Sequence, residues 1–172
     1  AASDVYKRQI LSTAVLLFLD QIAKYLAVLH LKGQAAIPII KNVFELQYLE
    51  NQGAAFGIMQ GKKTFFVIGT LIFLVIVGIL YHNIPLTKRF TPIRIVAVLI
   101  IAGAIGNMID RVVHQYVIDF FYFKLINFPI FNVADIYVVV ACILFILLML
   151  FYYKEEELGQ IFPFMKSKKA EE

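Results

Sequence analysis

The stretch that decides the fold is residues 133–153, VADIYVVVACILFILLMLFYY, in which Asp135 is the only charged residue. A helix that crosses the hydrocarbon core of a bilayer needs roughly 20 mostly apolar residues. Three further stretches meet this requirement: residues 10–31, 64–81 and 93–113. The sequence therefore predicts an all-α membrane protein with four transmembrane helices.

The composition agrees with this class. Of the 172 residues, 61% are hydrophobic and 16% are charged, whereas a soluble domain is about 45–50% apolar and about 25% charged. A short chain cannot hide such an excess in its core. These values exclude an ordinary soluble domain, a disordered chain and a disulfide scaffold, and they favour a single membrane domain over residues 1–172. The basic residues form no patch, so no nucleic-acid partner is expected.

Two segments between the predicted helices, residues 32–63 and 114–132, form the connections on one side of the membrane. In the first, Phe44, Leu46 and Tyr48 alternate with polar residues, which predicts a strand with one apolar face. The second is rich in aromatic residues, which favour the headgroup level of a bilayer. We expect a small amphipathic sheet on the outer leaflet.

The basic residues predict the orientation of the chain. An even number of spans puts both termini on one side, with nine basic residues: Lys7, Arg8, Lys88, Arg89, Arg94, Lys154, Lys166, Lys168 and Lys169. The other side has six: Lys32, Lys41, Lys62, Lys63, Arg111 and Lys124. Because cytoplasmic segments are enriched in Lys and Arg, we expect cytoplasmic termini and a charged, soluble cytoplasmic tail over residues 154–172.

Once serine, cysteine and metal sites are excluded, carboxylates remain as the candidate catalytic groups. The serines, Ser3, Ser12 and Ser167, lie outside both outer segments, which excludes a serine nucleophile there. Cys142 lies within an apolar run, where we expect it to pack. The three histidines lie at the ends of separate spans without the paired spacing of a zinc site, so no metal is predicted.

Four aspartates lie in or beside the predicted spans: Asp20, Asp110, Asp119 and Asp135. An acid there costs several kcal/mol or shifts its pKa, so each is a functional candidate. The neighbours of Asp119 are Val117, Ile118, Phe120 and Phe121, and burial among them would raise its pKa, as a general acid or base requires.

Asp135 has two interpretations. Asn132 can cap the last span and thereby place Asp135 at position N3, where an acid commonly caps a helix. Alternatively, Asp119 and Asp135 meet at the outer surface as an aspartyl dyad that shares one proton.

The remaining polar residues near the spans also allow a structural interpretation beside a functional one. Asp20 and Lys24, at i,i+4, predict an ion pair that is structural or that contacts substrate. Asp110 beside Arg111 predicts a carboxylate held ionised by its neighbour, which suits a scaffold.

Two other stretches contain small residues beside polar ones. Asn51 and Gly53 indicate a tight turn or the rim of a substrate site. Gly103 and Gly106 permit close helix packing, and Asn107 follows them at the outer boundary.

Five motifs carry a resemblance to a known family. They are, in order, DQIAK at 20–24, NQGAAFG at 51–57, GNMIDR at 106–111, VIDF at 117–120 and FNVAD at 131–135. In this set and order the sequence resembles the bacterial lipoprotein signal peptidases, also called signal peptidase II. The resemblance covers roughly residues 10–153.

The resemblance implies a four-helix aspartyl endopeptidase of the bacterial inner membrane, with a small extracytoplasmic β-cradle and no metal or cofactor. Such enzymes cleave diacylglyceryl-modified prolipoproteins just before the lipidated cysteine, at the extracytoplasmic face, and are blocked by globomycin. The implied partners are thus this substrate, membrane lipids and a globomycin-type inhibitor, and we expect a monomer.

By motif position, the resemblance assigns the catalytic dyad to Asp119 and Asp135, with Asp110 as the alternative first acid. The implied supporting or substrate-binding residues are Asp20, Lys24, Asn51, Gly53, Asn107, Asp110, Arg111, Asn132 and Ala134. A rival interpretation is a small proton-coupled transporter subunit that uses a relay of Asp20, Lys24, Asp110 and Asp135. A third is a membrane scaffold, which leaves the costly acids unexplained.

Overall fold

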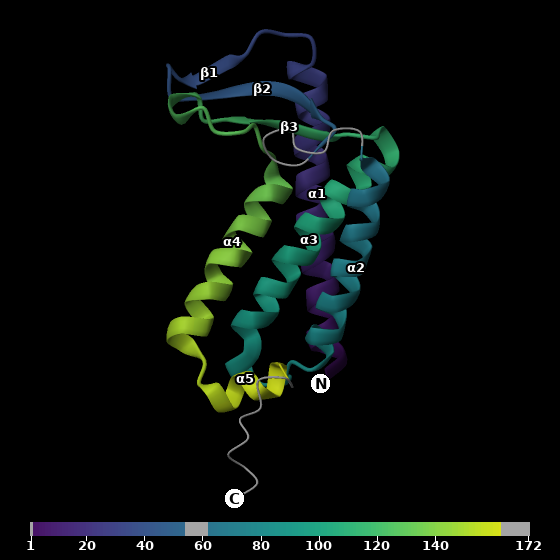
Figure 1. The fold of residues 1–172 in the computed structure, drawn as a ribbon, viewed down its shortest axis with the longest axis vertical. Coiled ribbons are helices and arrows are strands. Elements are labelled where there is room, and N and C mark those ends of the chain that lie inside the picture. Colours follow the sequence, from purple (N-terminus) through teal and green to yellow (C-terminus); the bar gives the residue numbers. More distant parts are fainter. Residues whose placement is uncertain (1, 54–61, 163–172) are drawn as a thin grey trace, which may run out of the picture.

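The computed structural model describes residues 2–53 and 62–162, as a bundle of long helices beneath a small sheet (Figure 1). The helices are α1 (Ala2–Leu31), α2 (Lys63–His82), α3 (Thr91–His114), α4 (Val133–Leu147) and the short α5 (Glu155–Ile161). A 3₁₀ turn, Lys88–Phe90, precedes α3, and a π-helical turn, Leu148–Tyr152, continues α4. Four of the helices in the described ranges are long and apolar enough to cross a membrane, as predicted.

The sheet has three antiparallel strands in the order β1 (Ile37–Ile40), β2 (Phe44–Asn51) and β3 (Val117–Tyr122). The alternating pattern predicted β2. The third strand lies where we predicted only an aromatic segment at the headgroup level. Its sequence, VIDFFY, is rich in the β-branched and aromatic residues that favour strands.

The prediction of one apolar and one polar face on β2 holds only in part. The side chain of Glu45 is buried, with its carboxylate 2.6 Å from the ammonium of Lys124 in the short 3₁₀ turn Lys124–Ile126. Phe44, also on β2, packs against the rings of Phe121 and Phe123. The sheet and the turn that follows β3 therefore form one packed unit.

One stripe along α1 fixes the bundle to the sheet. The buried residues of α1 are spaced by four, three and four positions: Asp20, Lys24, Ala27 and Leu31. Such spacing places them on one face of a helix. Ala27 and Leu31 pack against Ile118 and Phe120 of β3, while Asp20 and Lys24 lie deeper in the bundle. The helix also begins at Ala2, so residues 2–9, which precede the predicted first span, form its first turns.

Helix α3 packs against α1, α2 and α4, and its glycines permit the close approach that we predicted. A Cβ atom at Gly103 would lie 2.6 Å from the carbonyl oxygen of Ala134. A Cβ atom at Gly106 would lie 2.6 Å from Oδ2 of Asp20. Neither position has room for a larger residue. By contrast, Cys142, which we expected to pack within its apolar run, is exposed on the surface of α4.

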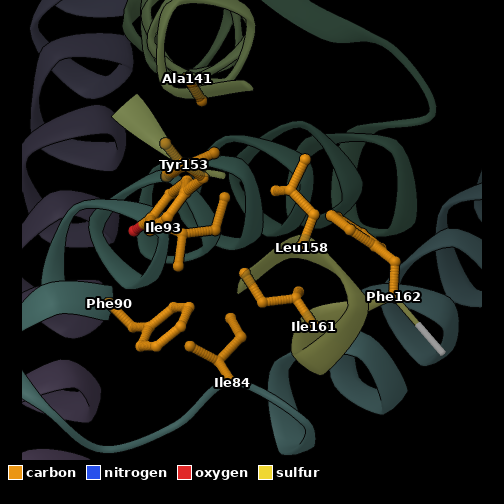
Figure 2. Packing of buried hydrophobic residues seen from close by; sticks show 9 residues of the cluster. Ile84, Phe90, Ile93, Ala141, Tyr153, Leu158, Ile161 and Phe162 are labelled. Carbon is orange, nitrogen blue, oxygen red and sulfur yellow. The ribbon is translucent and has the colours of Figure 1, made fainter. Parts of the chain in front are cut away.

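The opposite end of the bundle is closed by α5. The tail begins with exposed glutamates, as predicted, but Leu158, Ile161 and Phe162 are buried in an apolar cluster with Phe90 and Tyr153 (Figure 2). The structure therefore differs from a fully solvated tail. The reason is that these three apolar residues, at i, i+3 and i+4, form one face of a helix.

Candidate active site

Six of the eleven predicted site residues line one cavity of about 770 Å³ near the sheet. They come from the end of β2, from α3, from β3 and from α4: Asn51, Gly53, Asn107, Arg111, Asp119 and Asp135. The rest of the wall is mainly apolar and includes Val117, Phe131 and residues 138–140. The structure thus brings together acids that lie 16 positions apart in the sequence.

The first acid, Asp119, is only 1% exposed on β3. Its Oδ1 accepts a hydrogen bond from the amide of Asn132 at 2.6 Å, and its Oδ2 accepts one from the amide of Asn51 at 2.9 Å. Burial, and then the nearby charge of Asp135, raise the pKa of Asp119 to about 7, against the lowering effect of both amides. The predicted direction of this shift is confirmed.

The second acid, Asp135, has the capping position that we predicted for it, and it also lines the cavity. Asn132 is the N-cap of α4 and Asp135 is its N3 residue, in a reciprocal capping box with distances of 3.1 Å. The remaining carboxylate oxygen of Asp135 accepts a hydrogen bond from the amide of Asn107 at 2.7 Å. Because Asp135 also lines the cavity, the capping role and a role in the site are compatible.

Two asparagines connect these acids. The amide nitrogen of Asn132 that binds Asp119 also donates to Oδ1 of Asn107 at 3.0 Å, and Asn107 in turn binds Asp135. All four carboxylate oxygens of Asp119 and Asp135 therefore accept an N–H group. Such bonds fix the orientation of both carboxylates relative to the cavity.

Behind the asparagines lies a buried ion-pair cluster. The ammonium of Lys24 is 3.0 Å from carboxylate oxygens of both Asp20 and Asp110, and it donates to Oδ1 of Asn107 at 3.1 Å. The predicted Asp20–Lys24 pair is thus confirmed. Asp20 also accepts the backbone N–H of Ala134 at 2.9 Å, so it joins α1 to the start of α4.

The predicted pairing of Asp110 with Arg111 is wrong. Asp110 pairs with Lys24 and accepts the backbone N–H of Ile118 at 3.0 Å. Arg111 instead donates to the carbonyl oxygens of Asn107 and Gly53, each at 3.3 Å. The reason is that adjacent residues on a helix do not face each other.

Asn51 and Gly53 form the tight turn that was one of the two interpretations, and both also line the cavity. The backbone N–H of Gly53 donates to Oδ1 of Asn51 at 3.0 Å, which closes a turn after β2. The same asparagine holds Asp119 and lines the cavity. Residues 54–57 of this motif lie outside the described residues.

One site residue was missed by sequence reasoning. Gln21 donates to Oδ2 of Asp20 at 3.1 Å, to Oδ1 of Asp110 at 3.2 Å and to the carbonyl oxygen of Gly106 at 3.4 Å. The available signal was its position, as a polar residue beside Asp20 within an apolar stretch. Among residues 2–53 and 62–162, no group of three or more His, Cys, Asp or Glu side chains is placed to hold a metal ion.

The fold and the cavity together define a membrane protein with a buried site that contains two acidic side chains. Residues 12–151 match the family described as Signal peptidase (SPase) II. The chain belongs to this family, a family of bacterial membrane proteases, which confirms the family predicted from the five motifs.

Individual proteins agree with this assignment. The lipoprotein signal peptidase of Clostridium novyi is 44% identical over 133 residues, covering 74% of this chain and 87% of that protein. The lipoprotein signal peptidase of Caldanaerobacter subterraneus subsp. tengcongensis is 45% identical over 138 residues, covering 78% of this chain and 90% of that protein. A solved structure described as a bacterial membrane enzyme has a TM-score of 0.74 and 32% identity, covering 84% of this chain and 88% of that chain. Neither these proteins nor that structure favours the transporter alternative.

Proposed function

We propose that this chain is an aspartic endopeptidase that removes signal peptides from diacylglyceryl-modified prolipoproteins, cutting just before the lipidated cysteine. Family membership supports the substrate, since the relatives above are lipoprotein signal peptidases. The observation that carries the aspartic mechanism is the meeting of Asp119 and Asp135 in one cavity, with every carboxylate oxygen held by an N–H donor.

In this proposal the two carboxylates share one proton. Asp119 carries it, because burial and the neighbouring acid raise its pKa to about 7, and it polarises the scissile carbonyl. Asp135 takes a proton from a water molecule, whose oxygen bonds to the carbonyl carbon. The carbon–nitrogen bond then breaks, and the amino group of the lipidated cysteine leaves with the proton that Asp135 took from the water molecule. Asn51, Asn107 and Asn132 keep both acids in position for these transfers.

The walls of the cavity fit a lipid-modified substrate. Beyond its polar residues, the cavity is lined by apolar side chains of α4 and by Phe123, Phe128 and Phe131 from the segment after β3. These surfaces suit acyl chains and the apolar signal peptide. A lipid anchor holds the scissile bond at a fixed depth, so proximity supplies much of the specificity. A globomycin-type inhibitor would compete for the same cavity.

We place this chain in the bacterial inner membrane as one monomeric, four-span domain, with the sheet and the cavity outside and both termini in the cytoplasm. Two observations support this orientation. The basic residues are more numerous at the proposed cytoplasmic side, nine against six. The first residues of α1 and the helix α5 lie together at the end of the bundle opposite the sheet (Figure 1).

The test is cleavage of a diacylglyceryl-modified precursor by the purified full chain. Asp119→Asn and Asp135→Asn should each lower kcat/KM by about 10⁴-fold or more, as loss of one member of a catalytic unit does. The matched control is Asp4→Asn, in the exposed first turn of α1, which should leave kcat/KM unchanged. Circular dichroism checks that each variant is folded.

Asp110→Asn tests whether Asp110, rather than Asp119, is the first acid of the dyad. We expect it to lower thermal stability, since Asp110 pairs with buried Lys24. Full activity of folded Asp119→Asn or Asp135→Asn would contradict the dyad.

A further inference from the structure

A second cavity of about 600 Å³ adjoins the cavity that contains the two acids. Four residues line both of them: Asn51, Phe128, Pro129 and Ile130. Asn51 is also the residue that donates a hydrogen bond to Asp119. A chain that leaves the acids past Asn51 would therefore enter the second cavity directly.

The second cavity follows the length of β2. Gln47, Leu49 and Asn51, each two positions apart on this strand, all line it. A strand advances about 3.3 Å per residue, so this row extends about 13 Å away from Asn51. An extended polypeptide has the same rise, and about four of its residues would cover the row.

The chemistry of this second cavity differs from that of the first. Its polar side chains are mostly neutral amides and one phenol: Gln47, Asn51, Gln52, Asn127 and Tyr122. Glu50 is the one charged residue among those that line it in the described part of the chain, and it pairs with Lys32 at 2.7 Å. An amide side chain both donates and accepts hydrogen bonds, which matches the N–H and C=O groups of an extended backbone.

Tyr122 and Asn127, which line the same cavity, are linked to each other. The hydroxyl of Tyr122 donates to Oδ1 of Asn127 at 2.7 Å, and Asn127 has the left-handed φ of 49° that ends the turn after β3. This bond joins β3 to the start of the segment 127–130, of which residues 128–130 line both cavities. Acyl chains are poor ligands for such a surface, since they offer its amide side chains no hydrogen bonds in place of those to water.

We propose that the second cavity, which we term the polar groove, binds the substrate segment immediately C-terminal to the cleaved bond. About four residues after the lipidated cysteine lie there in extended form, with their backbone against Gln47 and Asn51. This inference rests on the proposed function, and it assigns to the mature part of the substrate a binding site separate from the apolar cavity.

The first experiment varies the length of the substrate. Diacylglyceryl-modified peptides with the same signal sequence end at the cysteine or extend beyond it by up to about six residues, because about four should fill the groove. We expect kcat/KM to rise with each residue up to the fourth and then to level off. Equal kcat/KM for all lengths would contradict substrate binding in the polar groove while leaving the proposed function intact. Failure of the native chain to cleave any of these peptides would instead contradict the proposed function.

The second experiment removes one amide from the groove. Gln47→Leu keeps the approximate size of the side chain but loses its hydrogen bonds, and should lower kcat/KM about threefold to tenfold on peptides with four residues after the cysteine. The loss should shrink as the peptide is shortened. The matched control is Gln34→Leu, exposed in the turn after α1 and outside the groove. A loss that is equal at all lengths would indicate a structural effect and overturn the assignment.

A measurement on the native sequence does not depend on the folding of a variant. A benzophenone photo-crosslinker is placed on the third residue after the cysteine or, in a second peptide, on the third residue before the cut. We expect only the first peptide to label the β2 stretch that contains Gln47 and Leu49. Labelling of that stretch only from the signal-peptide side would overturn the proposal.

Discussion

The two ends of the bundle are built by different means. At the sheet end, the buried interior is a polar network in which Lys24, Asp20, Asp110 and two asparagines hold the two acids of the cavity. At the α5 end, the buried interior is an apolar cluster (Figure 2). Arg94 is buried there too, but its guanidinium donates to carbonyl oxygens of the α2–α3 loop.

Because of this difference, substitutions at the two ends should affect stability and catalysis differently. A change at the α5 end alters the volume of packed side chains and leaves the acids where they are. A change at the sheet end alters the charge and position of groups that contact each other across α1, α3 and α4. We therefore expect substitutions at the α5 end to affect unfolding alone, and substitutions at the sheet end to affect unfolding and cleavage together.

The largest effect is expected for Lys24→Met, because Lys24 is 2% exposed and pairs with two carboxylates. Its removal leaves buried acids without a counter-charge, which costs about 3–5 kcal/mol of unfolding free energy. Cleavage should also fall, since Asn107 loses a donor. Thermal unfolding in detergent measures the first effect. Lys32→Met, at an exposed ion pair, is the control and should unfold at the native temperature. Equal midpoints for both variants would contradict the polar network as a source of stability.

A comparable change at the other end is Ile161→Ala, at a position that is 1% exposed in the apolar cluster. We expect a loss of about 2–4 kcal/mol from lost packing and the cavity left behind. The kcat/KM of the folded variant should equal that of the native chain. Leu150→Ala, at a position 68% exposed, is the control for loss of the same kind of side chain. A large fall in kcat/KM for Ile161→Ala would show that the two ends are coupled.

Gly106→Ala tests the close approach of helices at the sheet end. The new methyl group would lie 2.6 Å from Asp20, which must move. We expect a loss of about 1–3 kcal/mol, as in other overpacked interiors, together with a lower kcat/KM. The control is Gly78→Ala on α2, where no atom lies within 4 Å of the added Cβ. Loss of stability in the control but not at Gly106 would refute this account.

Sequence reasoning succeeded where the physics is local. The i,i+4 spacing of Asp20 and Lys24 fixes their pairing within one helix, and the N-cap position of Asn132 fixes the place of Asp135 at N3. The alternation that predicted β2 is equally local. The apolar neighbours of Asp119 likewise indicated its burial and the direction of its pKa shift.

The contacts between elements could not be predicted in this way. Lys24 meets Asp110 because particular faces of α1 and α3 face each other, and nothing in one sequence reports which faces meet. The bonds from Asn51 to Asp119 depend on the register of β2 against β3. The spacing of Leu158, Ile161 and Phe162 did indicate a helix with one apolar face in α5. We nevertheless predicted a soluble tail, because the preceding glutamates are charged.

The smallest expected effect is a shift along the pH axis, and it contrasts one carboxyl from each end. Burial and then Asp135 raise the pKa of Asp119 to about 7, whereas a hydrogen bond from Arg89 lowers the pKa of Glu157 to about 2. If Asp119 must hold a proton, kcat/KM of the native chain declines as pH rises through about 7. Glu157 titrates far below this range, so Glu157→Gln should leave the decline unchanged.

Asn51→Leu should move this decline to higher pH. Its amide donates to the carboxylate of Asp119 and thereby favours the ionised form. Without that bond the pKa of Asp119 rises, so the proton is kept to a higher pH even though the overall rate is lower. The kcat/KM profile over about pH 5–9 reports this pKa in the free enzyme. A shift to lower pH, or the same shift in Glu157→Gln, would contradict Asp119 as the protonated acid and remove the proposed division between the two ends.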